Sequence, residues 1–452
     1  MLQLLNKSWS DYLKPLFFTP RWNAAISACV VLFVCRFFLP WLGIIPYFAL
    51  LALIVLLIFD FALLFSKNKG FFATRSHAER FSNGDENPVR IDLENRYGFL
   101  VRVEVIDEIP VQFQRRDVSF KASLSGGQAT TISYQLRPVK RGAYEFGTIN
   151  VFVSTSINFI RRRYQFEQTA AVPVYPSYIQ MRKYQLMAIS NRLTEVGVKK
   201  VRRLGHSMEF EQVKEYVQGD DYRTLNWKAT ARKGQLMVNN FTDEKSQQVY
   251  CIIDKGRVMK MPFDGMSLLD YAINASLVLS NIALLKQDKA GLVTFSEKVG
   301  AFLMANNKPV QMQSILEVLY NQKTRYLESD FEQLYTALRR KVNQRSLVVL
   351  FTNFETLTGM RRQLPYLRKI ASHHLLLIVF FENTELKTLV TAPATNVEEV
   401  YTKTVAEKFA YEKRLIAKEL QQFGILSILT TPQDLTVNTI NKYLELKARQ
   451  AI

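Results

Sequence analysis

Two long apolar stretches near the start of the chain restrict its fold more than any other feature. They run from Asn23 to Leu39 and from Tyr47 to Phe65, and each is long enough to cross the ~30 Å hydrocarbon core of a bilayer. Residues 40–46 between them carry no charge and include two prolines and a glycine. Because these residues end helices, the pattern predicts a transmembrane helical hairpin within an N-terminal segment, residues 1–66.

The charges around this hairpin predict its orientation. Lys14 and Arg21 precede it, and Lys67 and Lys69 follow it. By the positive-inside bias, both flanks belong in the cytoplasm, so everything after Ser66 is expected on the cytoplasmic side of a bacterial inner membrane, in a multi-pass protein.

Two charged residues lie inside the apolar stretches. Arg36 is near the outer end of the first, from where its side chain can reach the headgroups, and Asp60 is deeper in the second. An intramembrane carboxylate can mark a proton path, but no partner at the same depth accompanies Asp60. A helix–helix or interfacial contact is therefore the preferred interpretation.

Residues 67–178 have the pattern of an antiparallel β-sandwich. Runs such as Val101-Arg102-Val103-Glu104-Val105 alternate apolar and polar residues, and turn-forming segments such as Ser125-Gly126-Gly127 separate them. The segment contains neither a His/Cys cluster nor an acidic ligand set, so we expect a spacer and docking module.

Charge and cysteine content limit the classes of partner. The formal net charge is +19, which favours an anionic partner or an anionic membrane surface. No nucleic-acid motif accompanies the charge, so no nucleic-acid binding is expected. Only three cysteines occur, which excludes a disulfide framework and favours a reducing compartment.

From Val249 to the end, apolar runs alternate with amphipathic helical patterns. Continuous apolar strands alternating with helices indicate a buried, mostly parallel sheet covered on both faces, an α/β domain over residues 249–452. The expected strands are 249–254, 290–295, 346–352, 374–380 and 425–429. Asp254 ends the first of them, at the edge where open α/β sheets place ligand chemistry.

Residues 179–248 are expected to hold a basic connector followed by the most distinctive segment of the chain. Ser207 is predicted to cap a short helix, and Asp220 or Asp221 to cap a second one from Tyr222 to Arg232. The polar residues gathered here are Asp220, Asp221, Arg223, Asn226, Trp227 and Lys228. They form either a docking surface beside Asp254 or a buried clamp that joins the β-sandwich to the α/β domain, and the sequence leaves both open.

This segment carries a family resemblance. The run MEFEQVKEYVQGDDYRTLNWKATARKGQLMV, the strand ending at Asp254 and the run SLVVLFTN are similar to the family called domain of unknown function 58, whose members resemble von Willebrand factor A domains. Weaker likeness extends over nearly the whole chain. The resemblance implies a von Willebrand factor A-like, Rossmann-like sheet in a membrane-anchored, non-enzymatic protein. It also implies an association with MoxR-type AAA+ ATPases.

The resemblance also raises the question of a metal. In von Willebrand A domains an Asp-x-Ser-x-Ser loop, a threonine and a second aspartate hold a divalent cation. This chain keeps Asp254 but has Gly256 and Val258 in place of the serines, while Ser329 and Asn353 stand at the other two positions. Magnesium prefers several hard oxygen ligands, so a degenerate site is expected, with magnesium bound weakly or only with a partner's carboxylate.

A different class of function is a metal-dependent hydrolase that uses Asp220, Asp221 and Asp254 as acid and base. No nucleophile or histidine lies near them in sequence, and no Walker-type loop is present to bind ATP. The preferred interpretation is an adaptor that binds a protein partner.

Overall fold

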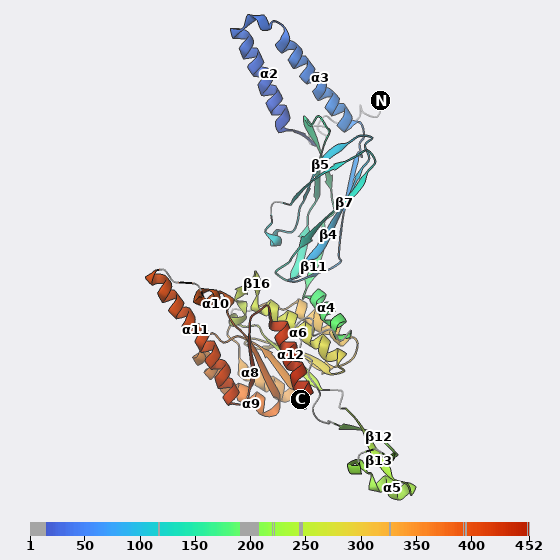
Figure 1. The fold of residues 1–452 in the computed structure, drawn as a ribbon, viewed down its shortest axis with the longest axis vertical. Helices are drawn as coiled ribbons and strands as arrows, with labels where there is room; N and C mark the ends of the chain where they lie inside the picture. The colour runs from blue at the N-terminus through green and yellow to red at the C-terminus, as the bar shows by residue number, and fades with distance from the viewer. Residues whose placement is uncertain are drawn as a thin grey trace. The chain divides into compact units, whose positions relative to one another are not determined.

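The computed structural model describes residues 15–115, 118–189, 208–218, 220, 222–243, 247–324, 327–391, 393, 396–449 and 451. The chain divides into two compact units, Met1–Val174 and Tyr175–Ile452, and Figure 1 shows the elements of each. The first unit holds two long helices and a set of antiparallel sheets, and the second is built on a six-stranded sheet.

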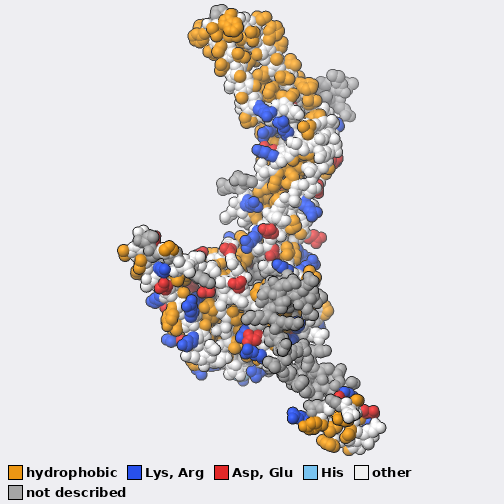
Figure 2. All heavy atoms as spheres, viewed as in Figure 1, with side chains coloured by type: hydrophobic (Ala, Val, Ile, Leu, Met, Phe, Trp, Pro, Cys, Tyr) orange, Lys and Arg blue, Asp and Glu red, His pale blue; other side chains and the backbone are white. Residues whose placement is uncertain are grey.

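The two apolar stretches form helices α2 (Pro20–Phe38) and α3 (Ile45–Phe65). Both are long and apolar enough to cross a membrane, and apolar side chains cover their surface in Figure 2. A third helix, α6 (Leu268–Leu285), passes the same test of length and composition but is 83% buried. It therefore belongs to the core of the second unit.

The base of the hairpin is fastened to the sheets of the first unit. The short strand β1 (Leu16–Phe18) pairs with β10 (Ile160–Phe166) directly before α2 begins. At the other end, Arg162 donates to the carbonyls of Leu64 and Lys67, both at 2.7 Å. These bonds give partners to carbonyl groups that would otherwise lack a hydrogen bond at the end of α3.

The two charged residues of the apolar stretches both have contacts. Asp60 is buried, with Oδ2 accepting from the backbone N–H groups of Phe159 and Ile160 at 3.0 and 3.1 Å and Oδ1 accepting from the Thr155 hydroxyl. Asp60 thus joins α3 to the sheet unit. The Arg36 guanidinium lies over the Tyr47 ring, 4.7 Å from its centroid, and links the two helices.

The rest of the first unit is the antiparallel β structure that the alternating pattern predicts. Its sheets have the orders β1-β10-β9-β5-β6, β2-β4-β7 and β3-β11-β8. The remaining strand bounds are β2 Phe71–His77, β3 Phe81–Ser82, β4 Asn87–Asn95, β5 Val101–Asp107, β6 Ser119–Leu124, β7 Ala129–Leu136, β8 Gly142–Phe146, β9 Ile149–Ser154 and β11 Ala170–Tyr175. Alternate residues of β4 and β5 are buried, so one face of each strand lines the core.

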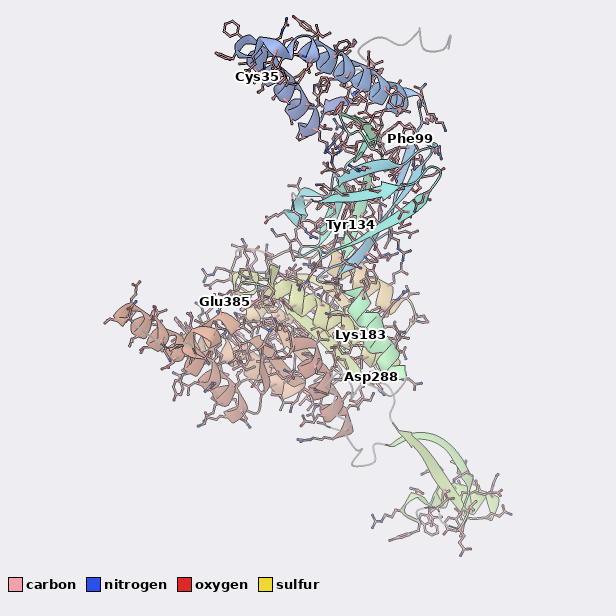
Figure 3. All side chains as sticks on the ribbon, turned by 45° about the horizontal axis from the view of Figure 1, so that its top comes forward. Cys35, Phe99, Tyr134, Lys183, Asp288 and Glu385 are labelled. Atoms are coloured by element: carbon pink, nitrogen blue, oxygen red, sulfur yellow. The ribbon has the colours of Figure 1, made fainter. Side chains whose placement is uncertain are left out.

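A buried ion pair lies between the strands of this unit. Arg75 of β2 binds both carboxylate oxygens of Asp107, the last residue of β5. The hydroxyl of Tyr134, which is labelled in Figure 3, donates to the same carboxylate. Both charged side chains are almost fully buried, so each supplies the counter-charge that the other needs inside the protein.

The six-stranded sheet of the second unit has the order β18-β17-β14-β19-β20-β21. Five neighbouring strands are parallel, and the edge strand β18 is antiparallel to β17. The bounds are β14 Gln248–Asp254, β17 Lys289–Phe295, β18 Val299–Asn306, β19 Leu347–Phe351, β20 Leu375–Phe381 and β21 Leu426–Thr430. Counted along this unit, the order is 3-2-1-4-5-6, the arrangement of doubly wound sheets, so the connections change direction between β14 and β19.

Helices cover both faces of this sheet. One core contains residues of α6 together with α4 (Tyr178–Ile189), α7 (Gln311–Tyr320) and α12 (Leu435–Ala448). The other contains residues of α8 (Phe331–Lys341), α9 (Leu357–His373) and α11 (Val397–Gln422). A further short helix, α10 (Thr384–Thr391), contacts α11. Helix α4 occupies the start of the segment expected to be a connector and packs on α6.

The distinctive segment folds as a hairpin arm. Strands β12 (Met208–Glu215) and β13 (Met237–Asp243) pair antiparallel, and between them lie the 3-10 turn η5 (Tyr222–Thr224) and helix α5 (Trp227–Lys233). The prediction of a helix after Ser207 was therefore wrong, because the alternation in MEFEQVKE has the period of a strand. The residue that caps α5 is Asn226, not Asp220.

Candidate functional site

The buried carboxylate of Asp254 is at the centre of the candidate site. Asp254 ends β14, Thr352 follows β19, and Ser329 lies shortly before α8. The Thr352 hydroxyl donates to Oδ2 of Asp254 at 2.7 Å, the Gly256 N–H donates to Oδ1 at 2.8 Å, and the Ser329 hydroxyl also donates to Oδ1. The fold thus brings three loops together at the carboxyl edge of the sheet, where its direction changes.

No cationic side chain among the described residues forms an ion pair with Asp254. Burial raises the pKa of this carboxyl, while the bonds from Ser329, Thr352 and the Gly256 N–H act in the opposite direction. Burial disfavours the charged form of Asp254, and the side chain is held in place by neutral donors alone. An incoming positive charge would therefore be favoured here.

Gly256 is a glycine for a spatial reason. A Cβ atom on Gly256 would lie 2.1 Å from Oγ of Ser329 and 3.0 Å from Oδ1 of Asp254. The Ser329 hydroxyl therefore occupies the space that a serine side chain at position 256 would need. Val258, at the other expected serine position, packs against the apolar core.

Of the three residues predicted to bind metal, two are in contact. Ser329 hydrogen-bonds Asp254, whereas the Asn353 side-chain oxygen accepts from Nζ of Lys413 on α11 at 2.6 Å. The residue that completes the Asp254 site is Thr352, which the sequence reasoning placed only in a strand. The sequence feature that could have identified Thr352 is its position at the end of a predicted strand, directly before Asn353.

These residues line a small crevice with a volume of about 170 Å³. Its rim is charged and exposed: Glu328 forms ion pairs with Arg362 at 3.0 Å and with Arg257 at 3.7 Å. The volume is below the range of about 300–1,000 Å³ that is usual for small-molecule sites. A single side chain of a partner protein is the size of group that fits.

The donor set fits magnesium only in part. Asp254, Ser329 and Thr352 offer hard oxygens, but only one of them is anionic, and both oxygens of Asp254 already accept hydrogen bonds. Within the part of the chain that the structure describes, no group of three or more His, Cys, Asp or Glu side chains is placed to hold a metal ion.

The residues of the hairpin arm have mostly local partners. Asp220 accepts from Nζ of Lys214 at 2.9 Å and from the N–H of Val217 at 3.0 Å, and these bonds lower its pKa. Asn226 caps α5 by accepting from the N–H of Ala229. Asp221 lies outside the described residues.

Arg223 lies in η5 and Trp227 begins α5, and Asn226 separates these two elements. The Arg223 guanidinium lies over the Tyr222 ring, 5.9 Å from its centroid. Trp227 is 70% exposed, and Lys228 beside it is exposed too. Asp220 and Asn226, by contrast, are half-buried.

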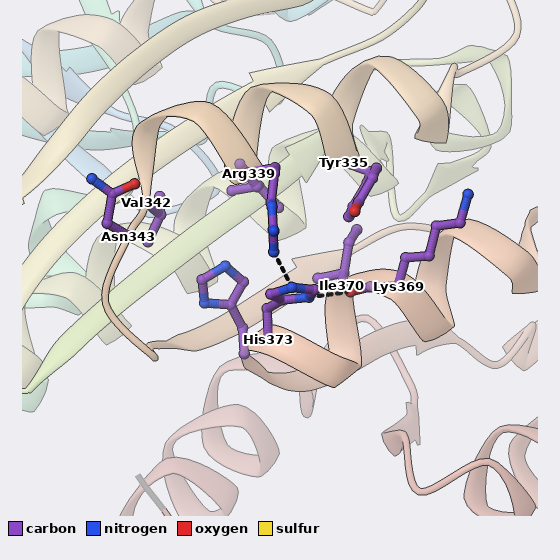
Figure 4. Close-up of a pocket in the computed structure, with 9 residues that line it drawn as sticks. Tyr335, Arg339, Val342, Asn343, Lys369, Ile370 and His373 are labelled. Carbon is purple, nitrogen blue, oxygen red and sulfur yellow. Dashed lines mark hydrogen bonds between the residues drawn. The ribbon is translucent and has the colours of Figure 1, made fainter.

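A second pocket, of about 360 Å³, lies at the ends of α8 and α9 and is drawn in Figure 4. There Arg339 donates to Nε2 of His373, and Nδ1 of His373 lies 3.0 Å from the carbonyl oxygen of Lys369. Basic side chains in the last turn of a helix offset its dipole. Arg339 lies in the last turn of α8, where its charge has this effect.

Comparison with known proteins places part of this chain in a family. Residues 212–409, which include the hairpin arm and the Asp254 crevice, match the family described as "Protein of unknown function DUF58". Residues 212–409 belong to the DUF58 family. This DUF58 segment begins within β12 and ends within α11.

A curated relative supports the assignment. The chain is 31% identical over 130 residues to the uncharacterized protein YeaD of Bacillus subtilis, a match that covers 28% of this chain. It spans only 32% of the length of YeaD.

Among solved structures, the chain is similar to the conserved hypothetical protein BatB from Bacteroides thetaiotaomicron, with 12% identity and a TM-score of 0.32. That match covers 45% of this chain and 98% of BatB. An aerotolerance-related membrane protein from Bacteroides fragilis matches with 14% identity and a TM-score of 0.28, over 44% of this chain and 98% of its own. Likeness at this level is too low to transfer fold or function.

Proposed function

We propose that the protein is a membrane-anchored, non-enzymatic adaptor that binds a protein partner at the Asp254 crevice. The observation that carries this proposal is a buried, uncompensated carboxylate at the bottom of a crevice of about 170 Å³ with an exposed, charged rim. A crevice of this size accepts one side chain, while the rim gives a partner ion-pairing groups around it.

A protein partner fits this geometry better than a hydrolase. A general acid or base needs a carboxyl within reach of substrate, but Asp254 is engaged by three donors and Asp220 is paired with Lys214. In the proposal neither carboxylate performs chemistry. Incubating the full chain with magnesium or manganese and with phosphate and carboxylate ester substrates tests this, and any turnover that Asp254→Asn abolishes would contradict it.

The sheet order supports a von Willebrand A-like domain with a degenerate metal site. The chain alone is one carboxylate short of what a hard divalent cation needs. We therefore propose no tight magnesium site in the free protein. A partner carboxylate that enters the crevice would supply the second negative charge, and magnesium titration with and without the partner separates the two situations.

In this proposal, α2 and α3 anchor the protein in a bacterial inner membrane, and the sheets of the first unit and the whole second unit lie in the cytoplasm. The length and composition of the two helices and the basic residues at both flanks support this. The family resemblance implies a MoxR-type AAA+ ATPase as the first partner to test, in complex assembly or chaperone work.

The test is affinity purification of the full-length protein from native membranes in mild detergent, with and without ATP. We expect one partner to be retained in a nucleotide-dependent manner and to be lost with Asp254→Asn. The matched control is Asp92→Asn, which changes an exposed carboxylate of the first unit. Equal retention by the wild type and by Asp254→Asn would show that the crevice is the wrong surface.

A further inference from the structure

A larger cavity lies beside the Asp254 crevice and has a different character. It has a volume of about 640 Å³, within the range of about 300–1,000 Å³ that small-molecule sites occupy. Residues from β20, α10, α11, the loop after β19 and the segment 261–268 line it, and half of them are apolar. The apolar members are Met261, Phe263, Leu268, Phe381, Leu386, Val390, Phe409 and Ala410.

The lining of this cavity includes one lysine, Lys413. Nζ of Lys413 on α11 donates to the Asn353 side-chain oxygen at 2.6 Å and lies 5.9 Å from the centroid of the Phe380 ring. None of the ion pairs among the described residues includes Lys413. Burial lowers the pKa of Lys413 to about 8, and the charge of nearby Glu355 only partly offsets this.

The surrounding charges limit what can bind beside Lys413. Glu355 and Glu382 also line the cavity, as does Arg414. A dianion such as a phosphate monoester would meet these two carboxylates with Lys413 as the only cation that is not fully exposed, because the Arg414 side chain is exposed to solvent. A single negative charge is the most that this arrangement favours, because one ammonium can satisfy one carboxylate.

We propose that this cavity is a binding site for an amphiphilic monocarboxylate, whose apolar body fills the space between α10, α11 and the sheet and whose carboxylate pairs with Lys413. The apolar lining supplies affinity, and the lysine fixes the orientation and selects the charge. This inference does not rest on the proposed adaptor function. It concerns a neighbouring cavity that shares Asn353, Glu355 and Thr356 with the crevice.

The experiment uses the full chain in detergent, with phenylbutyrate as the acid and phenylbutanamide as its uncharged counterpart. Binding is measured by isothermal titration against empty micelles. Phenylbutyrate is expected to bind about 10- to 100-fold more tightly than the amide, the gain of a charge-assisted hydrogen bond. Equal affinities, or no binding of either compound beyond the micelle reference, would overturn the proposal.

Two variants separate the roles of charge and cavity. Lys413→Met is expected to remove the preference for the acid and to leave the amide affinity unchanged, while Leu386→Trp fills the cavity and weakens both. The matched control is Lys408→Met, an exposed lysine on the same helix that does not line the cavity. A preference for the acid that persists in Lys413→Met would assign the carboxylate to another site and contradict the proposal.

Discussion

Asp107 in the first unit and Asp254 in the second both end a strand, and both are buried, but their charges are balanced in different ways. Asp107 binds Arg75 through both of its oxygens and accepts a third bond from Tyr134. Asp254 has only hydroxyl and backbone donors. The first carboxylate has a counter-ion, while the second is a buried carboxyl without one at the carboxyl edge of a sheet.

This difference separates a structural contact from a candidate site. A buried charge that lacks a counter-ion costs free energy, and such groups occur more often at functional sites than elsewhere. Asp107 connects strands from two sheets. Asp254 lines a crevice with an exposed, charged rim, which is why we propose binding at the second unit and a structural role for Asp107 in the first.

The largest expected effect on stability comes from breaking the ion pair between Arg75 and Asp107. Arg75→Met leaves Asp107 buried without its cation, and this should lower the stability of the first unit by about 3–5 kcal/mol. Proteolytic susceptibility of the full chain in detergent, across urea concentrations and with fragments assigned by mass spectrometry, measures the change. The control is Arg96→Met, whose pair with Glu94 is exposed and should contribute nothing measurable. Equal stability of the two variants would contradict the structural role of Arg75.

A smaller effect is expected from restoring a serine beside Asp254. Gly256→Ser forces a Cβ against the Ser329 hydroxyl, and overpacking of this kind costs about 1–3 kcal/mol. Adding Ser329→Ala should recover part of the loss, so the two substitutions are non-additive in a double-mutant cycle. Gly98→Ser is the control, because a Cβ on Gly98 would meet nothing within 4 Å. Strict additivity would mean that Ser329 does not occupy the space beside Gly256.

The smallest stability effect is expected from Asp254→Asn. The amide keeps one acceptor oxygen, a hydroxyl can reverse to accept from its NH₂ group, and a desolvated charge is removed. The stability of the second unit should change by no more than about 1 kcal/mol at acidic pH. Asp107→Asn, the same substitution at the paired site, should be far more costly because Arg75 loses its counter-ion. A similar loss at the two sites would remove the distinction between them.

The pH dependence of Asp254→Asn gives the sign of the electrostatic effect. Because burial raises the pKa of Asp254 above its ordinary value of 3.8, the native state holds this proton more tightly than the unfolded state. Wild-type stability should therefore fall, relative to the variant, as pH rises from about 4 towards the folded pKa. The same urea series at several pH values measures this change, and a wild-type stability that rises relative to the variant with increasing pH would show that the pKa of Asp254 is lowered.

Much of the architecture could be predicted from the sequence because burial leaves a strong pattern. The continuous apolar runs ending at Asp254 and Thr352 are strands β14 and β19, and the hairpin helices follow from two uninterrupted apolar stretches. The edge strand β18 was missed because its residues are mostly half-buried and show no clean alternation.

The contacts of the site were harder to predict than the strands. The Lys413–Asn353 bond joins residues 60 positions apart, and no local pattern predicts which lysine of a long helix reaches a strand end. The Ser329–Asp254 bond depends on Gly256, because the absent side chain makes room for the hydroxyl. Candidate site residues such as Asp254 and Ser329 could be chosen from their spacing in the sequence. Which of them contact each other depends on tertiary packing.

The most direct test of the account is photo-crosslinking in native membranes from two positions of the second unit. One probe replaces Gln363, which lines the crevice, and the other replaces Asn343, at the opposite edge of the sheet beside the pocket of Arg339 and His373. The account predicts an adduct with a single partner from position 363, lost with Asp254→Asn, and none with that partner from position 343. Equal adducts from both positions, or an adduct at 363 that Asp254→Asn does not change, would contradict binding at the crevice.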